Sequence, residues 1–421
     1  MALAAELDLG DAHADITDHD VYTRGVPHAT FLRLREEDPV HFTEEPDGRG
    51  FWSVTRYEDV LYVSRHTELF SSAKGIRLED MDPEETEARR TMMEMDPPQH
   101  TRYRRLVSRP FSPRSVAEYE AAVRELAHDV LEGVRGEERF EFVGRVARQL
   151  PMKMLGRLLG LADEDLEWLV VKGDALIGNT DAEFTEYVVD QVDTSEYRLL
   201  PFRSPVSLEL FSFADGALNE RRAHPTDDVL TALLQPTVDG DLLDDGQLKN
   251  FFTLMVAAGN DTTRYSMAAG LKALAERPSL LAELRDDPSR LKVAIDEMLR
   301  WSSTTMHFRR TATEDVELRG TTIRAGDKVV VWYVSADFDA AQFEDPFHFN
   351  AARDPNEHVA FGLHSPHLCL GQHLARLEMR VLFEELLPMI ETVEVVGTPE
   401  RLRSNFISGF KRLEVAAGWR T

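Results

Sequence analysis

The chain of 421 residues contains little cysteine, too few cationic side chains to balance its acidic ones, and no long apolar run. Its single cysteine excludes an internal disulfide, which suits a reducing compartment such as the cytoplasm. No apolar run approaches the roughly 20 residues of a membrane span, and the acidic N-terminus lacks the basic-then-apolar order of a signal peptide. The formal net charge of −27 argues against nucleic acid and anionic membranes as partners. We therefore expect a soluble, cytoplasmic protein.

Helical and strand-like patterns follow one another without a proline-, glycine- or serine-rich linker between them. Helical periodicity dominates residues 115–235, and it predicts one long apolar helix over residues 247–278. Aromatic and β-branched residues at 51–57, 60–66 and 321–339 predict small sheets. The hydrophobic content of 43% is enough for a large core.

The sole cysteine, Cys369, stands in the stretch FGLHSPHLCLG at residues 361–371. Glycine, serine and proline before it predict irregular backbone, and apolar residues at helical spacing predict a helix from Gln372 onward. The free N–H groups and the dipole at a helix N-terminus stabilise a thiolate. Such a thiolate could be a nucleophile or a metal ligand. A lone cysteine is otherwise most often an inert, buried small residue, so residues elsewhere must decide.

Three other places carry polar residues that a simple fold pattern does not explain. In the long helix, residues 259–263 are poor helix formers, and a bend without function is the plain alternative. His100 and Arg104 are four apart, Glu297 and Arg300 are three apart, and each pair would share one helix face. Such pairs usually lie on the surface and contribute little. Their meaning therefore depends on what surrounds Cys369.

The stretch 361–371 resembles the cysteine loop of the cytochrome P450 superfamily, in which cysteine gives the axial thiolate to haem iron. Ser365 stands where the family usually has glycine, and the loop is one residue longer than its commonest form. Residues 258–263, AGNDTT, resemble the oxygen-activating signature of the same enzymes, and the landmarks follow in the same order along essentially the whole chain. The loop residues that fall on the family pattern are Phe361, Gly362, His367, Cys369, Leu370 and Gly371.

This resemblance implies both a fold and a set of cofactor contacts. The fold would be mainly α with small β-sheets, one domain over residues 1–421 shaped as a triangular helical prism. Haem b would lie between the long distal helix and the helix after the cysteine loop, with Cys369 as the metal ligand. The other residues implied to bind the cofactor are His100, Arg104, Ala258, Gly259, Arg310, Phe361, His367 and Gly371. The structural triad implied to lock the chain before the cysteine loop is Glu297, Arg300 and Arg353.

The implied reaction is hydroxylation of an unactivated C–H bond with dioxygen and two electrons from NAD(P)H. A ferredoxin reductase and a ferredoxin would deliver the electrons. Thr262 would hold a hydrogen bond to bound dioxygen or to an ordered water, and Asp261 would feed protons from solvent. The arginines between Arg102 and Arg114 would dock the acidic ferredoxin, although a solvated face explains them equally simply.

The substrate is expected to be a largely hydrophobic small molecule, because apolar residues recur in the implied pocket. The sequence looks most like the branch that hydroxylates sterols, terpenoids and lipids. One alternative is tailoring of a natural product, including an amino acid on a carrier protein. A second is a non-catalytic haem sensor or ligand carrier, which the acid–alcohol pair argues against, as it does against a peroxide-driven enzyme. The expected lining comprises the polar loop 70–96, a cover at 197–207, Met255, Val256, Thr304, Phe308, Phe406 and Ile407.

Overall fold

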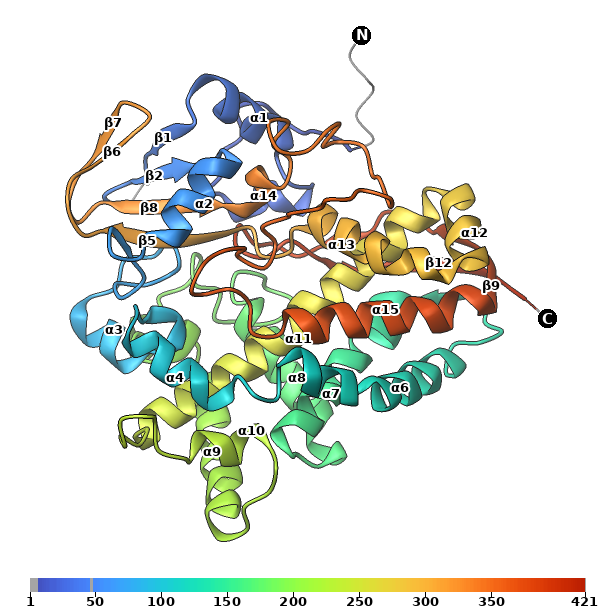
Figure 1. Ribbon diagram of the computed structural model, residues 1–421, viewed down its shortest axis with the longest axis horizontal. Coiled ribbons are helices and arrows are strands. Elements are labelled where there is room, and N and C mark those ends of the chain that lie inside the picture. Colours follow the sequence, from blue (N-terminus) through green and yellow to red (C-terminus); the bar gives the residue numbers. More distant parts are fainter. Residues whose placement is uncertain (1–6, 46–47, 421) are drawn as a thin grey trace.

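The computed structural model describes residues 7–45 and 48–420. Helices fill most of the molecule, and a sheet region stands at one side of them (Figure 1). The expected fold, mainly α with small sheets, is confirmed. The α-helices are α1 (His28–Glu37), α2 (Tyr57–Arg65), α3 (Pro83–Ala88), α4 (Gln99–Val107), α5 (Pro113–Glu118), α6 (Glu120–Glu132), α7 (Gln149–Leu159), α8 (Asp163–Ile177), α9 (Val206–Ala223), α10 (Val229–Leu233), α11 (Asp245–Ala275), α12 (Pro278–Asp286), α13 (Leu291–Ser302), α14 (Tyr333–Ala336) and α15 (Gln372–Met389).

The largest sheet of the described residues has the strand order β1-β2-β8-β5-β3, in which β2 and β8 run parallel and the other neighbours antiparallel. Smaller sheets pair β4-β12-β9, β6-β7 and β10-β11. The strands are β1 (Val40–Thr43), β2 (Phe51–Val54), β3 (Phe70–Ser71), β4 (Arg139–Glu141), β5 (His307–Ala312), β6 (Val316–Leu318), β7 (Thr321–Ile323), β8 (Lys328–Trp332), β9 (Ile390–Val395), β10 (Glu400–Arg401), β11 (Phe410–Arg412) and β12 (Glu414–Trp419).

One prediction of strand structure is wrong. Residues 60–65 belong to α2, where Tyr57, Val60, Val63 and Ser64 are buried. That spacing follows the helical period, so the apolar residues face one side of a helix and not alternate faces of a strand.

Helix α11 crosses the middle of the molecule and contacts α7, α8, α9 and α13 (Figure 1). A capping box starts it, because the Asp244 carboxylate accepts from the Gln247 N–H at 2.8 Å while the Gln247 side chain accepts from the Asp244 N–H at 3.0 Å. The predicted helix over 247–278 is confirmed, and it stays α-helical through the weak helix formers at 259–263. Tertiary packing outweighs local propensity here.

The main hydrophobic core gathers side chains from α6, α7, α8, α11, α13 and α15, and two smaller clusters pack on opposite faces of the five-stranded sheet, since alternate residues of β8 belong to each. Helix α15 lies against α6, α13 and α11. The loop that carries Cys369 enters α15, so its position depends on this packed helical block. Among the described residues, no helix combines the length and apolarity that crossing a membrane requires.

Candidate active site

The cysteine loop is a closed turn held by its own backbone. The Cys369 N–H donates to the Phe361 carbonyl at 2.9 Å, and the Ser365 N–H donates to the Gly362 carbonyl at 3.2 Å. Gly362 has a φ of 70°, a left-handed conformation that favours glycine. Ser365 has no such conformation, and its hydroxyl accepts from the His367 N–H at 3.1 Å. Serine is therefore compatible with this turn.

The Cys369 sulfur is accessible from a cavity although protein surrounds it closely. Burial raises the pKa of the thiol above its ordinary value, against the opposing influence of the Gly371 and Gln372 N–H groups and the Arg104 and Arg376 guanidinium groups. The predicted helix-terminus effect is thus present but smaller than the cost of burial. A thiolate at this position needs an additional positive charge, which a bound metal ion supplies.

This cavity lies between the cysteine loop and α11. Thr262 and Ala258 line it from α11, and His367 and Cys369 line it from the loop. The other predicted residues that line it are Arg104, Met255, Gly259, Thr304, Phe308, Phe361 and Gly371.

Four cationic or imidazole side chains gather at the edge of the cavity. The rings of His100 and His367 lie 4.2 Å apart between centroids, and the Arg104 guanidinium donates to the Leu368 carbonyl at 2.5 Å. Within the described part of the chain, both His100 ring nitrogens and the Arg310 Nε are buried without a hydrogen-bond partner. Leaving buried donors unmatched costs roughly 1–3 kcal/mol each. The cluster is therefore suited to an anion.

The histidines of this cluster resist protonation. Burial lowers the pKa of His367 to about 2, and the Arg310, His100 and Arg104 side chains push it in the same direction. Burial and Arg104 likewise lower the pKa of His100 to about 4. Neutral imidazoles beside permanent guanidinium charges can donate hydrogen bonds to carboxylates while the arginines supply the charge.

Arg309 and Arg310 are neighbours on β5, and the strand directs them apart. Arg309 forms an ion pair with Asp80 at 3.3 Å and donates to the Glu79 carbonyl at 2.6 Å. Arg310 instead lies close enough to His367 to lower its pKa. Of the two, Arg310 is the one placed to meet the anion.

The acid and the alcohol of α11 lie in different surroundings. The Thr262 hydroxyl borders the cavity and donates to the Ala258 carbonyl at 3.1 Å. Asp261 is buried and forms an ion pair with Arg264 at 2.9 Å, and Arg264 also pairs with Asp174 of α8 at 2.8 Å. Burial raises the pKa of Asp261 to about 7.

The Asp261 cluster continues to the surface. Arg148 lies 3.4 Å from Asp174 and 3.0 Å from Glu167, whose side chain is 63% exposed. Charged side chains therefore lie in contact with one another from the protein surface to Asp261.

A second cavity adjoins the first, since Thr262, Ala258 and Phe308 line both. The loop 70–96 lines it at nine positions, from Ile76 to Glu94, and the cover contributes Pro201 and Phe202. Phe406 and Ile407 also line it, as predicted. The prediction for Val256 is wrong, because its side chain lies against Gly173 of α8 and borders neither cavity.

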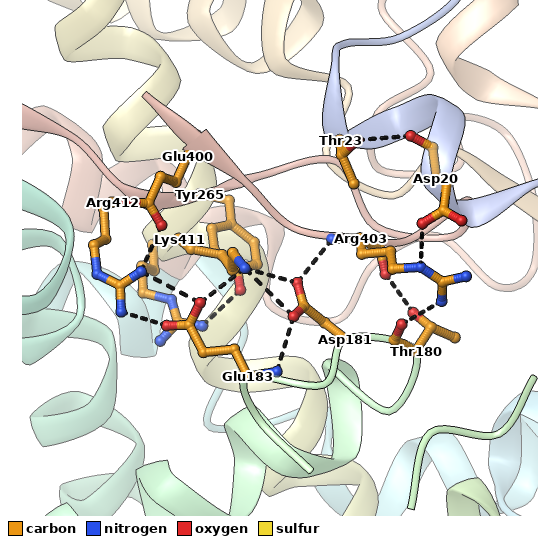
Figure 2. A network of polar contacts seen from close by, with 11 residues as sticks. Asp20, Thr23, Thr180, Asp181, Glu183, Tyr265, Glu400, Arg403, Lys411 and Arg412 are labelled. Atoms are coloured by element: carbon orange, nitrogen blue, oxygen red, sulfur yellow. Dashed lines mark hydrogen bonds and ion pairs between the residues drawn. The ribbon is translucent and has the colours of Figure 1, made fainter. Parts of the chain in front are cut away.

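Ion pairs hold residues 181–190, in the segment before the cover at 197–207, to residues 403–412 near the C-terminus, and Arg403 also reaches the N-terminal region (Figure 2). Arg403 pairs with Asp20 at 2.5 Å and with Asp190 at 2.7 Å. Lys411 pairs with Asp181 at 3.1 Å and with Glu183 at 2.8 Å.

The comparisons with known proteins agree with this geometry. The model of the family described as Cytochrome P450 matches residues 19–394. This chain belongs to the cytochrome P450 family. It is a P450 monooxygenase, and the family implies a haem-thiolate cofactor, dioxygen and an electron-transfer partner.

Several P450 enzymes resemble it over nearly their whole length. A methyl-branched lipid omega-hydroxylase of Mycobacterium tuberculosis is 36% identical, covering 98% of this chain and 94% of the relative. A steroid C26-monooxygenase of Mycolicibacterium smegmatis is 33% identical, covering 95% and 93%. A Mycobacterium marinum cytochrome P450 solved in complex with pseudoionone is 34% identical, covering 98% of this chain and 100% of that one, with a TM-score of 0.87.

The predicted structural triad of this P450 is assembled as expected. Glu297 and Arg300 are completely buried and pair at 2.8 Å, and Arg353 reaches the same carboxylate at 3.1 Å. Asn356 adds a hydrogen bond at 3.1 Å, and the Asn350 N–H adds another at 2.9 Å. These contacts fix the chain that leads into the cysteine loop.

The predicted docking arginines are mostly neutralised. Arg102 pairs with Asp239 at 2.6 Å, and Arg114 lies 3.9 Å from Glu118. Arg105 is exposed, and within the part of the chain that the structure describes it has no ion pair.

Sequence reasoning did not single out several charged residues that border the cavities, among them Glu378 and Arg77. Glu378 of α15 lines the cavity of Cys369, and burial raises its pKa to about 8. Arg77 lines the second cavity. Neither belongs to a spacing that could have indicated it, because ion pairing depends on tertiary neighbours.

Proposed function

We propose that Cys369 binds haem b as its axial thiolate ligand and that residues 1–421 work as one cytoplasmic catalytic domain. One observation carries this proposal. The sole cysteine and Thr262 border the same cavity from different elements, and unmatched buried polar atoms of His100 and Arg310 lie near His367, which lines that cavity. The two propionates of a porphyrin would provide the acceptors that these donors lack.

The chain's own residues would hold and orient the cofactor. Arg104, Arg310, His100 and His367 would bind the propionates. The Phe361 carbonyl fixes the direction of Cys369 by accepting its N–H. Once bound, the haem supplies dioxygen activation, which an axial thiolate promotes.

Thr262 and Asp261 would manage the protons of the reaction. The Thr262 hydroxyl is placed at the cavity to hold a hydrogen bond to dioxygen or a water molecule. Asp261, with its pKa near 7, can release and regain a proton at neutral pH. Asp174, which shares Arg264 with Asp261, would pass protons between Asp261 and solvent, while Arg148 and Arg264 stay charged and only position these acids.

The substrate would be a hydrophobic small molecule of the sterol, terpenoid or lipid class, hydroxylated at a C–H bond. Support comes from the apolar side chains that line the second cavity, including Ile177, Leu254 and Phe308, and from the names of the lipid- and steroid-oxidising relatives. The electrons would come from NAD(P)H through a reductase and a ferredoxin. Exposed Arg105 is a candidate contact for that ferredoxin.

A screen of steroids, terpenes and lipids for a haem spin-state shift would test this function. Ligands that shift the spin state should then be hydroxylated in the presence of ferredoxin, its reductase and NADPH, with one atom of labelled dioxygen in the product. Spin-state shifts without any oxygenated product would refute the monooxygenase role of this cavity.

A further inference from the structure

One arginine in the second cavity has no polar partner. The Arg77 guanidinium carbon lies 4.4 Å from the centroid of the Phe202 ring and 4.7 Å from that of the Phe406 ring. Within the described residues, its side chain forms no hydrogen bond and no ion pair. Stacking on rings occupies the faces of the guanidinium plane and leaves the N–H groups at its edge free.

The acids closest to Arg77 are bound by other arginines. Arg89 pairs with Glu79 at 3.0 Å and with Glu85 at 3.1 Å. Arg203 also pairs with Glu85, at 3.0 Å. Glu79 and Glu85 therefore form their ion pairs with Arg89 and Arg203, and Arg77 is the arginine of this group whose guanidinium has no direct ion pair.

A further acid in the same lining, Glu94, does not replace the missing partner. Its carboxylate accepts from the Thr91 N–H at 3.0 Å and from the Thr91 hydroxyl at 2.7 Å. Burial raises the pKa of Glu94, which favours its neutral form. Arg77 thus feels Glu79 and Glu94 only as nearby charges, without a hydrogen bond to either, at a wall that is otherwise largely apolar.

The cavity extends from Arg77 to the α11 residues Ala258 and Thr262. Leu254, Ala257 and Phe308 line the space as well and offer only apolar side chains. A molecule with one anionic end and an apolar body fits a cavity that is cationic at Arg77 and apolar toward Thr262. Its charged end would lie at the loop 70–96, and its apolar end would lie near Thr262.

We propose that Arg77 binds the carboxylate of an amphipathic acid and thereby directs oxidation to a carbon remote from that carboxylate. This assignment rests on the proposed function of the cavity as the substrate pocket. The planar guanidinium fork matches the two oxygens of a carboxylate, whereas an ester or alcohol offers no charge.

Spin-state titrations of the haem-loaded protein with matched acids and esters would test the anchor. The probes are hexadecanoic acid and methyl hexadecanoate, together with cholanic acid and its methyl ester. In at least one of the two acid–ester pairs, the wild type should bind the acid at least about tenfold more tightly than the ester. Arg77→Met should remove that preference with ester affinity unchanged, and Arg77→Lys should retain part of it.

Arg90→Met provides a matched control, because Arg90 lies in the same loop, pairs with Glu87 at 2.9 Å and does not line the cavity. It should keep the acid preference. The position of hydroxylation should be remote from the carboxylate in the wild type and spread along the skeleton in Arg77→Met.

The outcomes separate the anchor from the function. Acids that bind no better than their esters, or an acid preference that survives Arg77→Met, would overturn the anchor and leave the proposed function intact. Failure of every acid and ester to shift the spin state would overturn the anchor together with the lipid or steroid substrate class.

Discussion

The cavity of this P450 has two very different boundaries. The cysteine side rests on completely buried charges, since Glu297 and Arg300 both have side-chain exposures of 0%. On the cover side, the segment before the cover is held by ion pairs whose acids partly reach water, as Asp190 and Glu183 are both 33% exposed. Exposed pairs are screened by salt and stabilise little, whereas breaking a buried pair is costly. We infer that one boundary is built to stay fixed and the other to open.

A link between α13 and the cysteine loop strengthens the fixed side. Asp296 of α13 pairs with Arg376 of α15 at 2.7 Å and lies 3.3 Å from His358. The Arg376 guanidinium in turn lies 4.6 Å from the Phe361 ring, at the start of the loop. Displacing α13 would therefore disturb the loop on which Cys369 depends.

The largest expected effect is the loss of the buried carboxylate. Glu297→Gln should lower the free energy of unfolding by about 3–5 kcal/mol, because it leaves Arg300 and Arg353 buried without a countercharge. The matched change in the segment before the cover, Glu183→Gln, should cost about 1 kcal/mol or less. Denaturant titration followed by circular dichroism measures both. Equal losses in the two variants would remove the distinction between the boundaries.

The second largest effect concerns Asp261, the titratable residue beside Thr262. Asp261→Asn should reduce the rate of product formation about 100-fold, because proton delivery by a placed side chain contributes at least that factor. In the wild type, the fraction of consumed oxygen that appears in product should fall as pH rises through about 7, since Asp261 then loses its proton.

The asparagine variant should lack this pH dependence. Asp215→Asn on α9, whose carboxylate is 52% exposed, serves as the matched control and should retain wild-type coupling. A wild-type profile that stays flat across pH 6–8 would argue against Asp261 as the proton source.

The smallest effect tests the opening side directly. Raising the salt concentration from about 0.1 to 1 M shortens the screening length from roughly 10 to 3 Å. Substrate binding, followed as a spin-state change by stopped flow, should then become about two- to threefold faster. In the Arg403→Gln variant, substrate binding should be fast already at low salt, and raising the salt concentration should change its rate less. A binding rate that ignores both salt and Arg403 would mean that these ion pairs do not restrain the cover.

The sequence predicted the cofactor side of the site better than the substrate side. Cys369, Arg104 and His367 were found because the short stretches 100–104 and 361–371 resemble motifs of the family, and folding brings the two stretches together. Val256 was misplaced because its direction depends on the rotation of α11, which apolar periodicity on a fully buried helix does not define.

Arg77 could not be recognised for a different reason. The loop 70–96 contains three arginines and eight acids, and only the folded structure determines which of them pair. The strand predicted at 60–66 failed similarly, since a short apolar run is compatible with a strand or a helix until its neighbours are known.

The most direct test of the account is the absorption spectrum of the purified protein, reduced under carbon monoxide. Wild-type protein should show the strongly red-shifted band that a thiolate ligand imposes, and Cys369→Ser should lose that band. Wild-type haem protein with the band of a nitrogen-ligated haem, or a Cys369→Ser variant that keeps the red-shifted band, would contradict the central claim.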